Sequence, residues 1–169
     1  MSMNTQITIL LNSFLHVSPF FDWVVYAFAQ YSIFVVAAFF AWVTFSRLKI
    51  FILGITTSVI AWIISQGINI ATAVERPFIK LSEIVPLFTH GLNDSFPSGH
   101  AIIMFTLAFY TYYKYSKNTG LILMVLSIIS SLARVAAGIH WPTDIFGSII
   151  LAYIAVVLAD KAYSKYYDK

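Results

Sequence analysis

Long apolar segments alternate with short polar connections along most of the chain. Segments rich in aliphatic and aromatic side chains cover residues 20–45, 50–72, 98–115, 121–138 and 143–163. A helix needs about 20 apolar residues to cross a bilayer, so this pattern predicts five membrane-spanning helices. Residues 5–14 are shorter and more polar, and there we expect a helix that lies in the membrane interface or re-enters the bilayer.

The composition agrees with a membrane protein. Of the 169 residues, 60% are hydrophobic and only 10% are charged, against about 25% in a typical soluble domain. We therefore expect an all-α integral membrane bundle in which residues 1–169 form one membrane-embedded domain. The N-terminus lacks the basic start and the small-residue cleavage site of a signal peptide, so we expect the whole chain to be mature.

The connection over residues 73–97 is the longest polar stretch. Loops of this length in compact proteins are usually functional or mobile, and we expect a short helix within it over residues 78–89. We expect His16 and His90 to be solvated at the membrane interface. The chain has no cysteine, which excludes a disulfide framework, a thiolate nucleophile and a Cys-ligated metal.

The basic residues indicate how the predicted helices are oriented. With five spans, seven of the ten Lys and Arg residues fall on one side of the membrane. The positive-inside rule makes that side cytoplasmic, together with the C-terminus. The polar residues near the ends of segments 50–72 and 121–138 and the starts of segments 98–115 and 143–163 then share the opposite side. The net charge of +3 is small and is explained by this bias, so we expect no nucleic-acid partner.

One group of polar residues interrupts the apolar pattern at that opposite side. Arg134, His140 and Asp144 lie around Gly138 and Pro142, where a bend between two helices is expected. A carboxylate can fix one ring nitrogen of a neutral histidine and leave the other free as a nucleophile or base, and an arginine suits a phosphate or carboxylate. The alternative is an interface loop with a capping aspartate and a solvated histidine.

Further polar residues are predicted on the same side. Arg76 follows the second apolar segment, and Ser98, Gly99 and His100 open the third. Taken singly, each has a structural explanation. Arg76 would then be an interfacial arginine, Arg134 would pair with Asp144, Ser98 would cap a helix, and His100 would be solvated.

Together these residues resemble the motifs of the type 2 phosphatidic acid phosphatase family of membrane lipid phosphatases, which is related to the vanadium haloperoxidases. The resemblance rests on Arg76-Pro77, on Pro-Ser-Gly-His at 97–100, and on the spacing of Arg134, His140 and Asp144. Two positions depart from the family pattern: Asn69 stands in place of a lysine, and Ala133 in place of a serine.

The resemblance implies a role for each residue. His140 would attack phosphorus and form a phosphohistidine, and Asp144 would hold its tautomer. His100 would protonate the leaving oxygen and then activate water. The phosphoryl oxygens would be bound by Arg76, Arg134, Ser98, Gly99 and, more weakly than by a lysine, Asn69. No metal or other cofactor is expected.

The small bacterial members of the family provide the substrate hypothesis. We expect a lipid phosphate from the bilayer as the substrate, most specifically undecaprenyl diphosphate, hydrolysed to undecaprenyl phosphate. The alternatives are phosphatidic acid, phosphatidylglycerol phosphate or lipid A 1-phosphate, or a non-catalytic lipid-phosphate binder or carrier. The expected location is the bacterial inner membrane, with the active site on the periplasmic or extracellular side.

Overall fold

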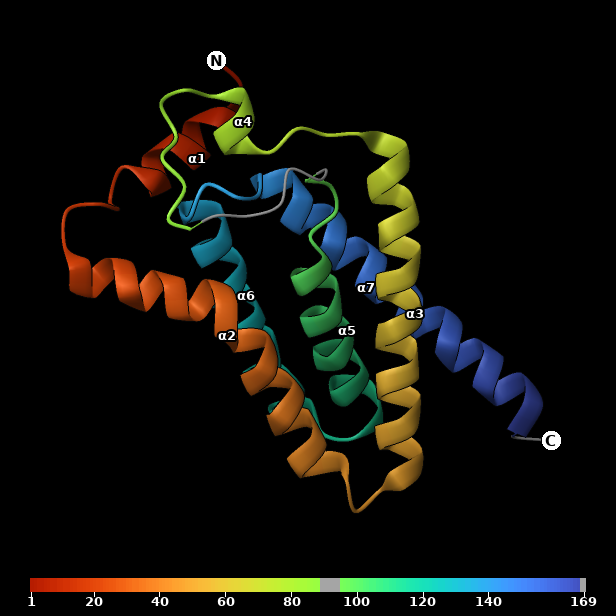
Figure 1. Ribbon diagram of the computed structural model, residues 1–169. Helices are drawn as coiled ribbons and strands as arrows, with labels where there is room; N and C mark the ends of the chain where they lie inside the picture. The colour runs from red at the N-terminus through yellow and green to blue at the C-terminus, as the bar shows by residue number, and fades with distance from the viewer. Residues whose placement is uncertain (89–94, 168–169) are drawn as a thin grey trace.

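The computed structural model describes residues 1–88 and 95–167. Over these residues the regular structure is helical, and the order along the chain is α1(Met3–Asn12), α2(Pro19–Thr44), α3(Leu48–Thr72), α4(Pro77–Lys80), α5(Gly99–Lys114), α6(Lys117–Ala136) and α7(Pro142–Tyr167). The long helices form one bundle, and α1 and α4 lie together at one end of it (Figure 1).

The helices begin where the sequence supplies suitable first residues. Proline is the first residue of α2 and of α7, where its missing N–H costs no hydrogen bond. The side chain of Ser116 accepts a hydrogen bond from the backbone N–H of Thr119 and caps α6. The predicted apolar segments therefore correspond to α2, α3, α5, α6 and α7, with boundaries that differ by a few residues.

The all-helical membrane architecture is confirmed, but the predicted count of five spans is not. Four helices, α2, α3, α6 and α7, are long and apolar enough to cross a membrane among the residues described. With 16 residues, α5 is about 24 Å long, and a typical hydrocarbon core is about 30 Å thick. Figure 1 shows that α5 begins deeper in the bundle than the nearby end of α3, so the loop before it descends from that end.

The central helix α5 holds the core together. It contacts α2, α3, α6 and α7. Phe40, Met104, Leu107 and Leu123 form its main buried cluster with Val36 and Ala108. Gly120 lets α6 approach α5 closely, because a Cβ there would lie 2.4 Å from the Cα of Tyr112.

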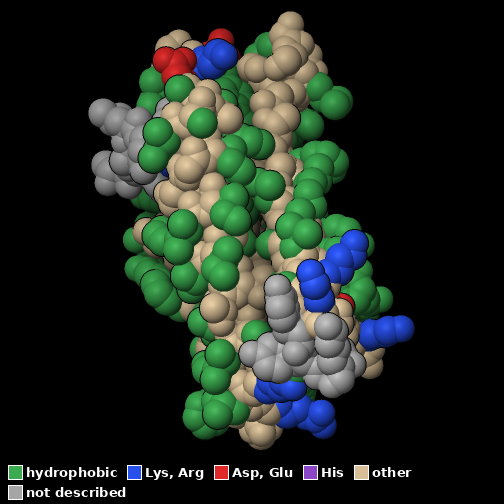
Figure 2. All heavy atoms as spheres, turned by 90° about the vertical axis from the view of Figure 1, so that its right-hand side faces the viewer, with side chains coloured by type: hydrophobic (Ala, Val, Ile, Leu, Met, Phe, Trp, Pro, Cys, Tyr) green, Lys and Arg blue, Asp and Glu red, His purple; other side chains and the backbone are tan. Residues whose placement is uncertain are grey.

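The outer surface suits a lipid environment. Large hydrophobic side chains are exposed on α2, α3, α6 and α7. Figure 2 shows hydrophobic side chains spread over the middle of one face, with Lys and Arg side chains gathered toward its lower end. That end holds the α2–α3 turn, the α5–α6 turn and the C-terminal part of α7 (Figure 1); it is called the basic end below.

The short helix predicted over residues 78–89 is wrong in extent. The helix α4 ends at Lys80, and Leu81 is already extended. The backbone N–H of Leu87 bonds instead to the carbonyl of Ala137, so the segment after α4 runs along the end of α6. Pro86, which lacks an N–H to donate, also opposes a continuous helix here. Thr89 and His90 lie outside the described residues.

Candidate active site

The three predicted motifs meet at the end of the bundle opposite the basic end. Arg76 precedes α4, Ser98 precedes α5, and Arg134 lies in the last turn of α6. His140 lies in the connection to α7, and Asp144 in the first turn of α7. Gly138 makes this connection possible because its φ of +75° is a conformation that other residues rarely adopt.

His140 and Asp144 form a buried pair. Nδ1 of His140 lies 3.4 Å from Oδ2 of Asp144 and 3.0 Å from the carbonyl oxygen of Ser95. Two acceptors therefore face Nδ1, which favours the tautomer with the proton on Nδ1. In that tautomer the lone pair is on Nε2.

Asp144 is itself fixed by hydrogen bonds. Its Oδ2 accepts from the backbone N–H of Trp141 at 2.7 Å and from the hydroxyl of Ser95. The bond to Trp141 resembles one half of a capping box, in which an acidic side chain reaches back to the N–H before the helix. The same carboxylate thus makes the helix-capping contact and lies beside His140, and its role in orienting a catalytic histidine stays a prediction.

Two guanidinium groups face the other nitrogen of His140. Nη1 of Arg76 and Nη2 of Arg134 each lie 3.5 Å from Nε2. Both arginines are buried, with 4% and 1% of their surface exposed, so neither is an interfacial arginine extended toward water. Guanidinium groups present several N–H donors in a plane, a geometry that matches the oxygens of a phosphate. The arrangement is suited to a phosphoryl group placed against Nε2.

Backbone carbonyls hold the two arginines in place. Nη1 of Arg76 donates to the carbonyl of Ile139 at 2.7 Å, and Nη1 of Arg134 donates to the carbonyl of Ala29 in α2 at 2.7 Å. The neighbouring carbonyl of Phe28 accepts from Ser32 and Ser130. Side chains that bind helix carbonyls are one cause of helix bending, and α2 is visibly bent (Figure 1).

Ala133, where the family pattern has serine, packs at the contact between α6 and α2. It belongs to a buried cluster with Leu15, Val25 and Ala29. Small side chains at positions 29 and 133 let the two helices approach. The approach brings Arg134, the next residue, to the carbonyl of Ala29.

The Pro-Ser-Gly-His segment enters the bundle and begins α5. Ser98 is at the capping position, but its side chain makes no capping bond, and within the described structure its buried Oγ has no hydrogen-bond partner. The proposal that Ser98 is a simple helix cap is therefore not supported. Gly99 packs against Trp62, because a Cβ there would lie 3.2 Å from the indole nitrogen. His100 is the second residue of α5 and is half-buried.

Asn69 supports the loop before this segment. Its side-chain N–H donates to the carbonyl of Phe96 at 3.2 Å, and the hydroxyl of Thr72 lies 3.3 Å from the same oxygen. Asn69 thus connects α3 to the Pro-Ser-Gly-His segment. A direct contact of Asn69 with phosphate stays a prediction.

Two serines at the site were missed from the sequence. Ser95 bonds to Asp144 and faces His140, and Ser148 accepts from the backbone N–H of Ser98 at 3.0 Å. Both side chains are fully buried. The sequence spacing could have indicated Ser148, because it lies four residues after Asp144 and hence on the same face of a helix. Ser95 lies in an irregular loop, where spacing carries no such information.

The family model and the sequence relatives that match this chain point to the same family. A family model described as PAP2 superfamily matches residues 48–167. The undecaprenyl-diphosphatase BcrC of Bacillus subtilis (strain 168) is 26% identical over 129 residues, which cover 76% of this chain and 65% of that protein. The chain spans about half the length of the curated relatives it matches.

Two solved structures share the fold. The crystal structure of Aquifex aeolicus LpxE matches with a TM-score of 0.81 and 22% identity, over 95% of this chain and 96% of that chain. A transmembrane PAP2 type phosphatidylglycerolphosphate phosphatase from Bacillus subtilis matches with a TM-score of 0.65 and 18% identity, over 96% of this chain and 85% of that chain.

Proposed function

Because the chain belongs to the PAP2 superfamily, we propose that it is a lipid phosphatase of a bacterial inner membrane that hydrolyses undecaprenyl diphosphate to undecaprenyl phosphate. The observation that carries this proposal is the environment of His140. Its Nδ1 faces a carboxylate and a carbonyl, and its Nε2 faces two guanidinium groups.

The reaction proceeds in two transfers at phosphorus. Nε2 of His140 attacks the terminal phosphorus, so a P–N bond forms while the bond from phosphorus to the bridging oxygen breaks. Undecaprenyl phosphate leaves, with His100 as the acid that protonates the departing oxygen. Water, deprotonated by His100, then attacks the phosphohistidine, which releases inorganic phosphate and restores His140.

The other residues stabilise charge during these transfers. Arg76 and Arg134 bind the phosphoryl oxygens, on which negative charge resides in the transition state. Ser98 and the backbone N–H of Gly99 donate further hydrogen bonds at the start of α5, where the helix dipole also favours an anion. Asn69 contributes a neutral donor where the family pattern has a cation. Asp144 stabilises the imidazolium character that develops on His140.

A lipid substrate suits the surroundings of the site. An apolar groove of about 160 Å³ runs between α1, α6 and α7 and is lined by Leu11, Leu132 and Ile145. Val135 and Pro142 also line it, and they are neighbours in sequence of Arg134 and Trp141. The groove could hold a polyprenyl or acyl chain, as expected for a lipid substrate.

The orientation follows from the charges at the two ends. The basic end is cytoplasmic, and the candidate site faces the periplasm or the cell exterior. In this arrangement α5 also crosses the membrane, in addition to α2, α3, α6 and α7. The helix α1 lies at the outer interface, and the C-terminus is cytoplasmic.

Related substrates are the alternatives within the same chemistry: phosphatidic acid, phosphatidylglycerol phosphate and lipid A 1-phosphate. Phosphatidylglycerol phosphate should be included in any assay, because a solved phosphatidylglycerolphosphate phosphatase has the same fold. A non-catalytic lipid-phosphate binder is the alternative of another class, suggested by the uncharged Asn69.

The test is phosphate release by the purified protein in detergent. Undecaprenyl diphosphate, phosphatidic acid and phosphatidylglycerol phosphate are compared at equal molar fraction, with His140→Ala as the control. We expect preference for the diphosphate and a loss of about 10³-fold or more in His140→Ala. Preference for a glycerolipid would reject the carrier-lipid assignment, and binding without release from any substrate would favour the non-catalytic alternative.

The phosphohistidine gives a second readout. Substrate labelled in its terminal phosphate should transfer label to the protein, and the label should resist base and be lost in acid. Circular dichroism of His140→Ala must match the unchanged protein, because His140 is buried and its removal leaves a cavity. Label retained in a folded His140→Ala protein would place the nucleophile elsewhere.

A further inference from the structure

The backbone carbonyls that lead from α6 to His140 are bonded by distant parts of the chain. The four consecutive residues 136–139 each accept a hydrogen bond from a residue outside α6. The donors, in order, are the side chain of Asn12 at 2.9 Å, the backbone N–H of Leu87 at 3.2 Å, the backbone N–H of Phe78 at 3.3 Å and Nη1 of Arg76 at 2.7 Å. The end of a helix leaves carbonyls without partners in the helix, so these donors help to fix the path of the connection to His140.

Asn12 supplies the first of these bonds from α1, outside the residues that match the family model. Its side chain is buried, and both its nitrogen and its oxygen are bonded. Nδ2 donates to the carbonyls of Ala136 at 2.9 Å and Val85 at 3.0 Å, and Oδ1 accepts from the backbone N–H of Val85 at 3.2 Å. Asn12 therefore joins the end of α6 to the loop that supplies the next donor, Leu87.

A second asparagine of α1 makes the matching contact on the other side of His140. Nδ2 of Asn4 donates to Oγ1 of Thr143 at 3.1 Å, and its Oδ1 accepts from the backbone N–H of Thr143 at 3.2 Å. Thr143 lies in the first turn of α7, next to Asp144. Asn4 and Asn12 are eight residues apart and so share one face of α1. The helix thus holds the chain just before and just after the connection that carries His140.

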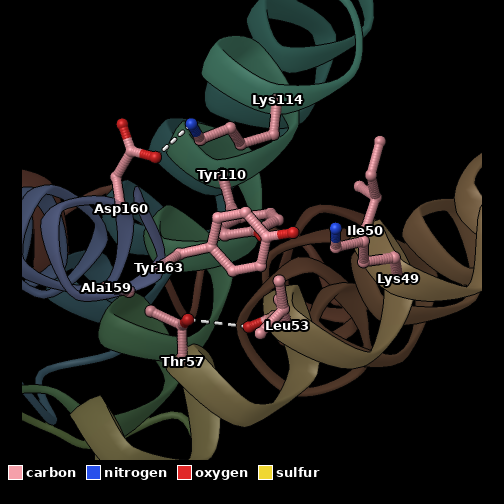
Figure 3. Close-up of a pocket in the computed structure, with 9 residues that line it drawn as sticks. All are labelled: Lys49, Ile50, Leu53, Thr57, Tyr110, Lys114, Ala159, Asp160 and Tyr163. Atoms are coloured by element: carbon pink, nitrogen blue, oxygen red, sulfur yellow. Dashed lines mark hydrogen bonds and ion pairs between the residues drawn. The ribbon is translucent and has the colours of Figure 1, made fainter. Parts of the chain in front are cut away.

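At the basic end, α7 is held by contacts that do not involve α1. Asp160 forms an ion pair with Lys114 of α5, and the ring centroid of Tyr163 lies 4.6 Å from Nζ of Lys49 in α3. Figure 3 shows these side chains around a cavity between the three helices. Loss of the contacts with α1 should therefore disturb the start of α7 and the His140 connection, and leave the rest of the bundle in place.

We propose that α1 positions His140 and Asp144, with Asn12 and Asn4 as the positioning residues. This role rests on the proposed function, in which His140 attacks phosphorus. Both asparagines act through the backbone, Asn12 at the end of α6 and Asn4 at the start of α7. A displacement of about 1 Å can slow catalysis about 10²-fold, so a looser connection should lower the rate more than it weakens substrate binding.

Kinetics of phosphate release test the two residues. Asn12→Leu keeps a similar volume and removes the three hydrogen bonds, so we expect kcat to fall about tenfold with KM little changed. Asn4→Leu should lower kcat about threefold. The matched control is Gln6→Leu, at an exposed position of the same helix, which should keep full activity. An unchanged kcat in both asparagine variants would overturn the proposal, and so would a rise in KM alone, which would indicate a substrate contact.

Hydrogen exchange measured by mass spectrometry gives a readout that does not need catalysis. In both asparagine variants the segment 136–144 should exchange about tenfold faster than in the unchanged protein, with α5 unaffected. Equal acceleration in α5 would show a general loss of stability and overturn the proposal. If Asn12→Leu does not fold, Asn4→Leu decides, because Asn4 is only half-buried. Absence of phosphate release from the unchanged protein would reject the proposed function, whereas exchange would still show whether α1 holds the His140 connection.

Discussion

Ser95 and Asp144 are joined by a hydrogen bond in which the Ser95 hydroxyl donates to Oδ2 of the carboxylate. The carbonyl of Ser95 lies 3.0 Å from Nδ1 of His140, so one residue contacts both members of the pair. We infer that Ser95 is a positioning residue that fixes the carboxylate while its carbonyl fixes the imidazole.

Replacing Ser95 tests this role. Ser95→Ala keeps the carbonyl but removes the hydroxyl, so we expect kcat to fall about tenfold with KM little changed. Ser95→Thr, which restores a hydroxyl, should recover most of the rate. The matched control is Ser82→Ala, an exposed serine of the same long connection. An unchanged kcat in Ser95→Ala would remove Ser95 from the positioning role.

Gly147 should be sensitive because Phe96 packs against it. A Cβ at Gly147 would lie 2.3 Å from the ring of Phe96, so Gly147→Ala must shift this ring, which belongs to the segment that leads to Ser98. We expect kcat/KM to fall about tenfold or more, since displacing reacting groups by a fraction of an ångström already slows catalysis.

Gly67→Ala is the matched control, because Gly67 is also in a helix and nothing lies within 4 Å of the added Cβ. It should keep full activity and raise the free energy of unfolding by about 0.5–1 kcal/mol. Equal activity of the two variants would show that the packing of Phe96 does not position the segment.

Asn69→Lys restores the cation of the family pattern. Since Asn69 already contacts the loop that leads to Ser98, a lysine there should reach the phosphate and tighten inhibition by inorganic phosphate about tenfold. Asn118→Lys adds the same charge at an exposed position of the basic end and should have no effect. An unchanged inhibition constant in Asn69→Lys would show that the side chain at position 69 contacts the loop and does not reach the phosphate.

Removal of metal ions should leave activity intact. In the proposed mechanism Arg76 and Arg134 supply the positive charge at phosphorus, so phosphate release should continue in excess chelator. The measurement is the release rate before and after dialysis against chelator, with Mg²⁺ added back. A loss that Mg²⁺ restores would contradict the metal-free mechanism.

The sequence predicted well what depends on local pattern. The apolar segments predicted the positions of α2, α3, α5, α6 and α7 to within a few residues, although only four of these helices are long and apolar enough to cross a membrane. The spacing of His140 and Asp144 across a helix start indicated their pairing, and the structure brings Arg76 and Arg134 to the same nitrogen.

What the sequence did not reveal depends on contacts between distant segments. Ser95 and Ser148 are ordinary serines until the fold places them beside Asp144 and Ser98. The end of α4 at Lys80 likewise follows from the pairing of Leu87 with Ala137, which no local propensity shows. The reduced length of α5 results from the descent of the Pro-Ser-Gly-His segment into the bundle.

The bond from Arg134 to the carbonyl of Ala29 has a consequence for protein engineering. The residues that match the family begin at 48, whereas this carbonyl belongs to α2. A fragment cut before α3 would retain every candidate catalytic side chain but lose the acceptor that orients one of them. A chimera that exchanges catalytic segments between relatives should therefore carry its own α2, because a foreign second helix would present a different carbonyl to the arginine.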